Sequence, residues 1–430
     1  MRPGLIDLPV SSPIFYCWLC FLIATCLLIP PFYPPSLGGI PLFAGNFVFI
    51  AGGLVFLRKS NLIAITSDRV VRNGFYFLGA LALSLPFAWW FSGPGLTSRS
   101  LLRFGLVCQP FLVYWLIRSS SIFSDDARLE SFVKLLVWIG AVVAVYGTID
   151  FYWPIPLSHH FAVQFIYLKG QALRRAQGVF YESSSFGNIC AFFLSLTSCL
   201  TFSMRRLLTR RQQMTLFLLS GVFVTALFLS YSRGSWMAVF VTLAIFLVLY
   251  PGIRMKDVIL TALVSSLPIL ILYKGSPEIV SNFVSYRVGA IGELSRNPNF
   301  ATSGRWGNWS ALIQYFWTHP WLLLFGIGYK TLPYTPLFGK KIIADNGYLS
   351  ILFECGVIGL ITFLWMNLSL LRSFQQVRRA QNPFRSFLGT FMLAFWCGEL
   401  VQLSTGDIFT YWRNLILFFA LAAAIPLIEK

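Results

Sequence analysis

The residues best placed to do chemistry lie in polar stretches of an otherwise apolar chain. One such stretch, from about Lys274 to Asp345, holds Arg287, Arg296, Arg305, Lys330, Lys340 and Lys341 against only Glu278, Glu293 and Asp345. Guanidinium and ammonium groups bind phosphate through charge-assisted hydrogen bonds. The stretch therefore predicts a site for an anionic ligand, and a lipid diphosphate is the ligand class that we expect.

The composition of the whole chain is that of a membrane protein. Of its 430 residues, 57% are hydrophobic, 17% are aromatic and only 11% are charged, which lies outside the range of soluble globular proteins. The apolar runs are continuous over about twenty residues and do not alternate, so they predict helices and exclude a β-barrel. The formal net charge of +18 suits contact with anionic membrane lipids. No basic stripe with interleaved aromatic residues is present, so nucleic-acid binding is not expected.

The cysteines predict neither a disulfide framework nor a metal site. All eight fall inside apolar runs. Disulfide frameworks and zinc sites use polar loops with regular cysteine spacing. We therefore expect the cysteines to be small core residues, and we expect no metal and no cofactor.

Twelve apolar runs predict an all-α integral membrane protein of about twelve transmembrane helices, a single polytopic domain over 1–430. The runs lie near 13–31, 41–57, 74–92, 100–118, 131–150, 184–204, 213–231, 234–250, 257–273, 346–371, 384–402 and 408–427. Basic residues follow the even-numbered runs, which places those loops and both termini in the cytoplasm. The loop 151–183 and the large loop 274–345, between spans nine and ten, are then external.

Three external segments carry cations where membrane topology alone would exclude them. Arg174 and Arg175 lie in the loop 151–183, Arg233 lies in a tight turn between two apolar runs, and Arg305 lies in the large loop. The positive-inside rule disfavours such positions, so a ligand-binding function explains them better. For Arg233 the alternative is an interfacial anchor whose side chain extends toward the headgroups.

The large loop contains an apparent amphipathic helix near 304–318. Trp306, Trp309, Ile313 and Phe316 recur at helical spacing and predict one apolar, aromatic face. The helix ends before Pro320, because proline disfavours a helical residue before it. Such a helix either covers a cavity as a lid, lies on the membrane interface, or packs on the bundle.

Asp345 lies directly before the tenth apolar run, and two interpretations of it stay open. An aspartate is ionised at neutral pH and can accept the proton of an attacking hydroxyl. It is also a good N-cap for the helix that follows. Tyr348, one turn further on, is expected to face the same cavity, whereas Glu354 lies on the opposite side of that helix and is expected to be a structural partner. His159 and His160 are the alternative bases.

Four motifs together resemble the bacterial O-antigen ligase and Wzy-type polymerase superfamily. They are Arg175-Ala176-Gln177-Gly178-Val179-Phe180, then Ser232-Arg233-Gly234, then the run from Gly304-Arg305 through His319-Pro320 to Gly326-Ile327-Gly328, and last Asp345-Asn346-Gly347-Tyr348-Leu349 with Glu354-Cys355-Gly356 after it. They cover residues 175–360. Each motif is weak alone, but their order and external placement make the set fairly specific.

The resemblance implies a glycosyltransferase of the bacterial inner membrane with its active site on the periplasmic face. Members of this superfamily join a glycan carried on undecaprenyl diphosphate to an acceptor, which is a glycan or a lipid-linked molecule, without a metal. By motif match Arg175, Arg233 and Arg305 are the expected ligands of the diphosphate and glycan, with Arg174 and Tyr348 beside them. Membrane lipids and polysaccharide-assembly proteins are the expected partners.

One departure from the family pattern favours a polymerase. Asp345 stands where the ligases have a histidine, so we expect an inverting, metal-independent polymerase acting on undecaprenyl-diphosphate-linked glycan. The alternative within the class is an O-antigen ligase that transfers glycan to lipid A-core. An alternative from another class is a lipid-linked oligosaccharide flippase or carrier, in which the same arginines guide a diphosphate through a cavity.

Overall fold

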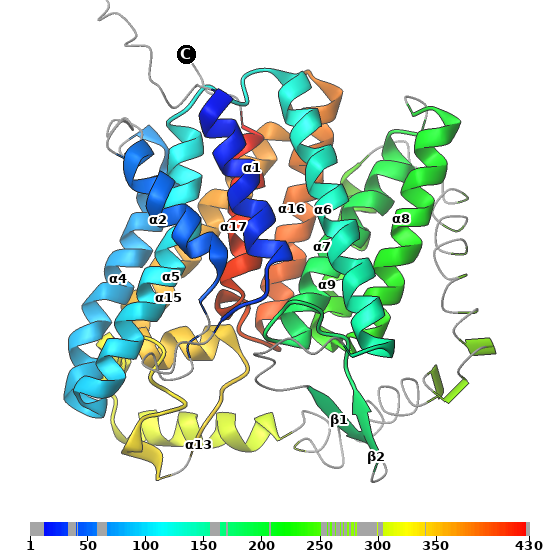
Figure 1. Ribbon diagram of the computed structural model, residues 1–430. Helices are drawn as coiled ribbons and strands as arrows, with labels where there is room; N and C mark the ends of the chain where they lie inside the picture. The colour runs from blue at the N-terminus through cyan, green and yellow to red at the C-terminus, as the bar shows by residue number, and fades with distance from the viewer. Residues whose placement is uncertain are drawn as a thin grey trace, which may run out of the picture. The chain divides into compact units, whose positions relative to one another are not determined.

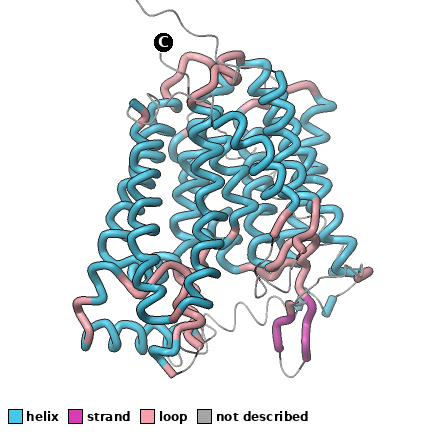
Figure 2. The backbone as a smooth tube through the Cα atoms, turned by 60° about the vertical axis from the view of Figure 1, so that its left-hand side comes forward, coloured by secondary structure: helices cyan, strands magenta, loops and turns pink. Residues whose placement is uncertain are grey.

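The structure is a computed structural model of the 430-residue chain. It describes residues 13–32, 40, 42–57, 67–154, 164–168, 171–205, 208–250, 304–339 and 341–426, together with isolated residues between 256 and 299. Within these ranges the chain is predominantly helical. Two short antiparallel strands form a hairpin, β1 (Phe165–Leu168) and β2 (Gln171–Arg174), which Figure 2 draws in magenta.

Helices occupy every predicted apolar run except the ninth, near 257–273, which lies outside the described ranges apart from isolated residues. They are labelled in Figure 1: α1 (Pro13–Leu28), α2 (Ala44–Leu57), α4 (Arg69–Ser92), α5 (Pro94–Arg118), α6 (Asp126–Tyr152), α7 (Ser183–Ser203), α8 (Arg210–Leu229), α9 (Arg233–Leu249), α15 (Gly347–Val377), α16 (Pro383–Leu403) and α17 (Trp412–Ala424). The large loop adds α13 (Arg305–Thr318), α14 (Leu322–Phe325) and the 3-10 turn η3 (Pro336–Phe338), and η4 (Ile408–Thr410) precedes α17.

Length and composition confirm an α-helical membrane fold at a coarse level. Among the described residues, seven helices are long and apolar enough to cross a membrane, namely α4, α5, α6, α7, α8, α15 and α16. The apolar helices α1, α2, α9 and α17 are shorter, with 10 to 17 residues. The total of about twelve spans, and the external position of the large loop, stay predictions.

The chain forms two compact units. Unit 1 contains Met1–Leu135, Ala311–Gly389 and Phe409–Lys430, and unit 2 contains Leu136–Ser310 and Thr390–Ile408. In unit 1, α4 packs against α5 and α15, and α17 packs against α5. Asp68 begins α4 because its Oδ1 accepts hydrogen bonds from the N–H groups of Val70 and Val71.

The core of unit 2 is α7, which is buried along almost its whole length between α8 and α9. Two glycines of α6 let α7 approach closely. A Cβ atom on Gly140 would lie 2.4 Å from the ring of Phe193, and one on Gly147 would lie 2.2 Å from the ring of Phe186. Small residues at such contacts are the usual means by which membrane helices come together.

Candidate functional site

The turn between α8 and α9 carries Arg233, and it is held by the segment that carries Arg175. Helix α8 ends at Leu229, and α9 begins at Arg233 with Ser232 as its N-cap residue. The Arg175 Nε donates to the carbonyl oxygen of Ser230 at 2.8 Å. The N–H of Ala176 donates to the carbonyl oxygen of Leu229 at 2.8 Å. Unit 2 thus brings Arg175 to the turn that positions Arg233, although the two lie 58 residues apart in the sequence.

Arg174 has a different surrounding from Arg175. It is the last residue of β2, and its Nη2 lies 3.1 Å from the Oδ1 of Asp150, whose side chain is fully buried in α6. A buried carboxylate needs a cationic partner, since an unpaired charge in an apolar interior is costly. The ion pair therefore joins the β-hairpin to α6, and it gives Arg174 a structural role whether or not it also touches a ligand.

A buried polar network reaches the α8–α9 turn through Ser232. The Nδ2 of Asn188 donates to both carboxylate oxygens of Glu399, at 2.8 and 2.9 Å, and lies 3.3 Å from the Oε1 of Gln402. The Nε2 of Gln402 lies 3.5 Å from the Ser235 Oγ, which is 2.8 Å from the Ser232 Oγ. The sequence alone does not point to Asn188 or Gln402, because an isolated amide inside an apolar run carries no signal of its own.

Arg305 is the first residue of α13, directly after Gly304 in a left-handed conformation with φ +84°. The start of the helix is fixed by Asn299. The N–H of Gly304 donates to the Asn299 carbonyl oxygen at 2.7 Å, and the N–H of Gly307 donates to the Asn299 Oδ1 at 3.2 Å. The described structure therefore supports a helix over the stretch where one was predicted, with Arg305 at its N-terminal end.

The residues of the predicted aromatic face of α13 do not all have the same environment. Phe316 is 2% exposed and packs with Leu312 in a core cluster of unit 1, whereas Trp306 and Ile313 are 51% and 54% exposed. The ring of Phe316 lies 4.3 Å from the ring of Phe353 in α15. The helix is apolar on two sides, so hydrophobic spacing alone could not tell which side faces protein.

The segment after α14 is bound to a kink in α15. Gly356 has φ +72°, which interrupts the helical hydrogen-bond pattern. The carbonyl oxygens of Phe353 and Glu354 accept instead from the N–H groups of Ile327 at 3.0 Å and Gly328 at 2.9 Å. The Oε1 of buried Glu354 accepts from the N–H of Leu332 at 3.2 Å, in keeping with the structural role expected of it.

Asp345 is not the N-cap of α15, which corrects one of the two interpretations of this residue. The cap is Asn346, whose backbone is extended and whose Oδ1 accepts from the N–H of Leu349 at 3.1 Å. Asp345 has φ +44°, a left-handed conformation that aspartate and asparagine tolerate better than most residues. Tyr348 follows in the first turn, partly exposed, with its ring 6.1 Å from that of Phe363. His159 and His160 lie outside the described residues.

Three non-glycine residues in or near the motifs have a left-handed backbone conformation. In the described part of the chain, the non-glycine residues with positive φ are Tyr231 at 52°, Lys330 at 59° and Asp345 at 44°. Tyr231 lies two residues before Arg233, and Lys330 follows the Gly326-Ile327-Gly328 motif. Such conformations cost about 1–3 kcal/mol each and gather at functional sites, where the surrounding structure maintains them.

Arg103 was not among the predicted site residues, and it lies in unit 1 beside two cations of the large loop, Lys330 and Lys341. Arg103 of α5 donates from Nη1 to the carbonyl oxygen of Lys330 and from Nη2 to the hydroxyl of Tyr334, both at 3.0 Å. The Nζ of Lys341 lies 5.9 Å from the centre of the Tyr334 ring. Its position gave only a weak signal, because Arg103 lies inside the fourth predicted run, 100–118, near the end that the predicted topology makes external.

The described residues form no recognisable metal centre. No three His, Cys, Asp or Glu side chains gather within this part of the structure as a metal site would require. None of the eight cysteines forms a disulfide.

Comparison with known proteins agrees with the motifs. Residues 214–364 match the family model described as O-antigen ligase, and this region contains Arg233, Arg305 and Asp345. Arg174 and Arg175 precede it. A search of curated proteins gave no match. The family match confirms the resemblance to the O-antigen ligase and Wzy-type superfamily.

Proposed function

We propose, from the match of residues 214–364 to the O-antigen ligase family model together with the four motifs, that the chain is an inverting, metal-independent glycosyltransferase of the bacterial inner membrane. It acts on a glycan carried by undecaprenyl diphosphate at the periplasmic face, and polymerisation is the reaction that we favour. The observation that carries the proposal is the position of Asp345. This carboxylate lies inside the matched region and directly precedes Asn346, the N-cap of α15, and its backbone is in the left-handed conformation.

The leaving group sets the first requirement of this reaction. The acceptor oxygen forms a bond to the anomeric carbon while the bond from that carbon to the diphosphate oxygen breaks, and the electron pair leaves with the lipid diphosphate. Guanidinium groups stabilise the charge that develops there, because they stay protonated and bind phosphate through paired hydrogen bonds. Arg175 and the turn that carries Arg233 supply this chemistry in unit 2, and Arg305 is the third arginine of the proposal.

The attacking hydroxyl sets the second requirement, which is a base. A carboxylate at Asp345 takes the proton of the acceptor hydroxyl as the new glycosidic bond forms. Asn346 already provides the side-chain cap of α15, so capping does not explain why an acid precedes it. The left-handed backbone of Asp345 supports the same role, since strain of this kind is maintained where it pre-organises a functional group.

The identity of this residue favours polymerisation over ligation. By the motif resemblance, Asp345 stands where the ligases carry histidine. A ligase that transfers glycan to lipid A-core remains the second candidate of the same class, because the arginines and the first step of the chemistry would be the same.

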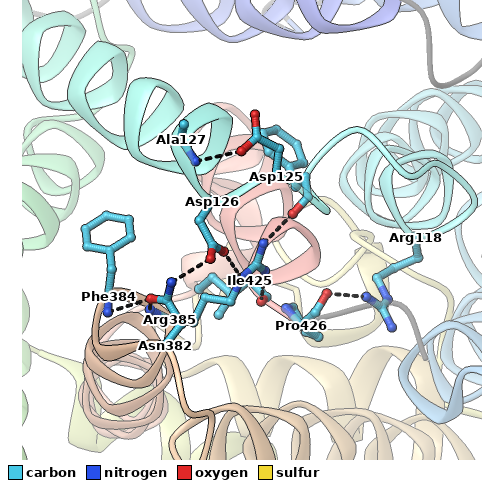
Figure 3. A network of polar contacts seen from close by, with 10 residues as sticks. Arg118, Asp125, Asp126, Ala127, Asn382, Phe384, Arg385, Ile425 and Pro426 are labelled. Atoms are coloured by element: carbon cyan, nitrogen blue, oxygen red, sulfur yellow. Dashed lines mark hydrogen bonds and ion pairs between the residues drawn. The ribbon is translucent and has the colours of Figure 1, made fainter. Parts of the chain in front are cut away.

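A polar network at one end of unit 1 supports an enzyme over a carrier (Figure 3). Arg385, only 1% exposed, binds Asp126 at the start of α6 and donates to the carbonyl oxygens of Phe123 and Ile425. Arg118 at the end of α5 donates to the carbonyl oxygen of Pro426 at 2.8 Å. A carrier that opened between these helix ends, on the side predicted to be cytoplasmic, would leave a buried guanidinium without its partners, so the network disfavours an opening at this place.

The products of the purified protein distinguish the three candidates. The protein in vesicles is incubated with undecaprenyl-diphosphate-linked glycan, with or without lipid A-core. Longer lipid-linked glycan from the donor alone supports the polymerase, whereas glycan on lipid A-core that forms only when this acceptor is added supports the ligase. Donor that crosses the bilayer with its glycan length unchanged in both reactions would overturn the proposal.

A further inference from the structure

Helix α13 has a second apolar side, which is largely exposed in the described structure. Trp317 is 85% exposed and Ile313 is 54% exposed, while Trp306, at 51%, lies on the same side by helical spacing. Beyond the helix, Trp321 and Leu324 are 58% and 50% exposed. We call these five residues the tryptophan face. The helix is already anchored to unit 1 by other residues, so this face is not needed to hold it in place.

The tryptophan face is continuous with the end of a candidate transmembrane helix. The ring of Trp321 lies 5.8 Å from that of Phe91 in the last turn of α4. In the same turn, Trp89 and Trp90 are 61% and 81% exposed. Helix α4 is long and apolar enough to cross a membrane, so exposed side chains at its end face either lipid or headgroups.

Three features of the tryptophan face favour lipid as the surface that it contacts. Tryptophan is enriched where a protein crosses the headgroup layer, because its ring is apolar and its N–H remains hydrated. Figure 1 shows α13 crosswise to the long helices of unit 1, so the helix lies along a surface and does not span. Arg305, at its first position, is its only charged residue, which leaves no charge on the exposed side to favour bulk water. A lipid interface meets all three conditions.

We infer that the tryptophan face is inserted into the bilayer at the boundary between headgroups and acyl chains. The insertion fixes α13 and α14 at the depth of the lipid phosphates, together with the segment from Gly326 that is hydrogen-bonded to α15. This inference concerns the contact with lipid and holds whether or not the protein transfers glycan.

Depth-dependent quenching tests the inference on the full-length protein. The protein is reconstituted in vesicles of phosphatidylcholine and phosphatidylglycerol in which the acyl chains carry bromine either near the headgroup or near the chain end. The fluorescence of Trp317 is obtained as the difference between the parent protein and Trp317→Phe. Two matched variants calibrate depth: Trp138→Phe, at an exposed position midway along α6, and Trp115→Phe, at a buried position in α5.

The expected result is that bromine near the headgroup removes more of the Trp317 emission than bromine near the chain end does. We expect the reverse order for Trp138 and little loss for Trp115. Trp317 emission that neither lipid quenches would overturn the inference. If Trp317 is protected at high protein-to-lipid ratio and quenched by aqueous iodide at low ratio, a second copy of the chain covers the face and the inference is also wrong.

Discussion

At the residue scale, the proposed base and the helix cap are neighbours with separate roles. Asn346 bonds to the N–H of Leu349, and Asp345 precedes it with a left-handed backbone. An asparagine at position 345 keeps the backbone preference and the shape of the side chain, but it removes the charge. Chemistry and folding can therefore be separated by single substitutions at these two positions.

We expect Asp345→Asn to lower the rate of glycan transfer by about 10²–10⁴-fold, the usual effect of losing a general base. Thermal stability should match that of the parent, because the cap at Asn346 is intact. The measurement is product formed per unit time from purified lipid-linked donor. Near-parental turnover would place the base elsewhere, and His159 and His160 would be tested next.

Asn346 supplies the matched control. Aspartate is as good an N-cap as asparagine, so Asn346→Asp should retain both stability and turnover. Asn346→Ala removes the bond to the N–H of Leu349 and should destabilise the protein by about 1 kcal/mol. A stability of Asn346→Ala equal to that of the parent, measured by thermal unfolding, would contradict the capping role.

Arg175 and Arg174 allow a second comparison between neighbouring residues, because they have different partners. Arg175→Lys cannot keep both a bond to the Ser230 carbonyl oxygen and a paired contact with phosphate. Losing one hydrogen bond to a charged group costs about 1.5–3 kcal/mol, so kcat/KM should fall about ten- to hundredfold. Arg174→Lys disturbs the ion pair with Asp150, so it should mainly lower the unfolding temperature. Its loss of kcat/KM should be smaller than that of Arg175→Lys. Equal losses of kcat/KM in the two variants would contradict the assignment.

At the element scale, α13 is fixed to unit 1 by its buried side. Leu312 is fully buried there, and the neighbouring Ile313 is 54% exposed. Leu312→Ala should destabilise the protein by about 2–5 kcal/mol and reduce product formation, because α13 would no longer be held against α15. The variant should still insert into the membrane.

The matched variant Ile313→Ala leaves no cavity inside the protein and should keep most of the parental stability. Thermal unfolding in detergent, together with turnover in vesicles, measures both variants. A Leu312→Ala protein with full activity and unchanged stability would show that the packing of α13 has no functional consequence.

Apolar run length and period predicted the elements well. The runs predicted the long apolar helices of the described structure, because a bilayer needs continuous apolar sequence. Period also indicated the helix over 304–318, but it could not separate a face that packs on protein from one that faces lipid, since both are apolar. One of the two open interpretations of Asp345 placed the N-cap one residue too early, because aspartate and asparagine cap helices equally well and the cap is Asn346.

Pairings between distant residues could not be predicted from one sequence. Arg103 binds the carbonyl oxygen of Lys330, and Asn188 binds Glu399, at separations of 227 and 211 residues. These contacts arise from how the helices pack, and composition and periodicity carry no information about them. The arginines were chosen as candidate ligand-binding residues for another reason, which is that their positions break the positive-inside rule of membrane topology.

At the scale of the whole molecule, the ends of four helices are joined in unit 1 by the network around Arg385 (Figure 3). Arg385 is buried and its partner Asp126 is 42% exposed, so Arg385→Met leaves no buried charge behind. It does leave the buried carbonyl oxygens of Phe123 and Ile425 without this donor, at a cost of about 1–3 kcal/mol each, so the unfolding temperature should fall. Lys134 pairs with Glu130 at 3.6 Å on an exposed helix surface, and Lys134→Ala should change stability by less than about 1 kcal/mol. Similar unfolding temperatures for the two variants would contradict a structural role for the network.

The central claim is that the chain transfers glycan and does not merely move its lipid carrier across the membrane. The most direct test uses nanodiscs, because a nanodisc has no two compartments between which a carrier could work. Purified parent protein in nanodiscs, given undecaprenyl-diphosphate-linked glycan, should form longer lipid-linked glycan, and Asp345→Asn should form far less. A donor that stays unchanged in nanodiscs, while the same preparation moves it across vesicle membranes, would contradict the claim.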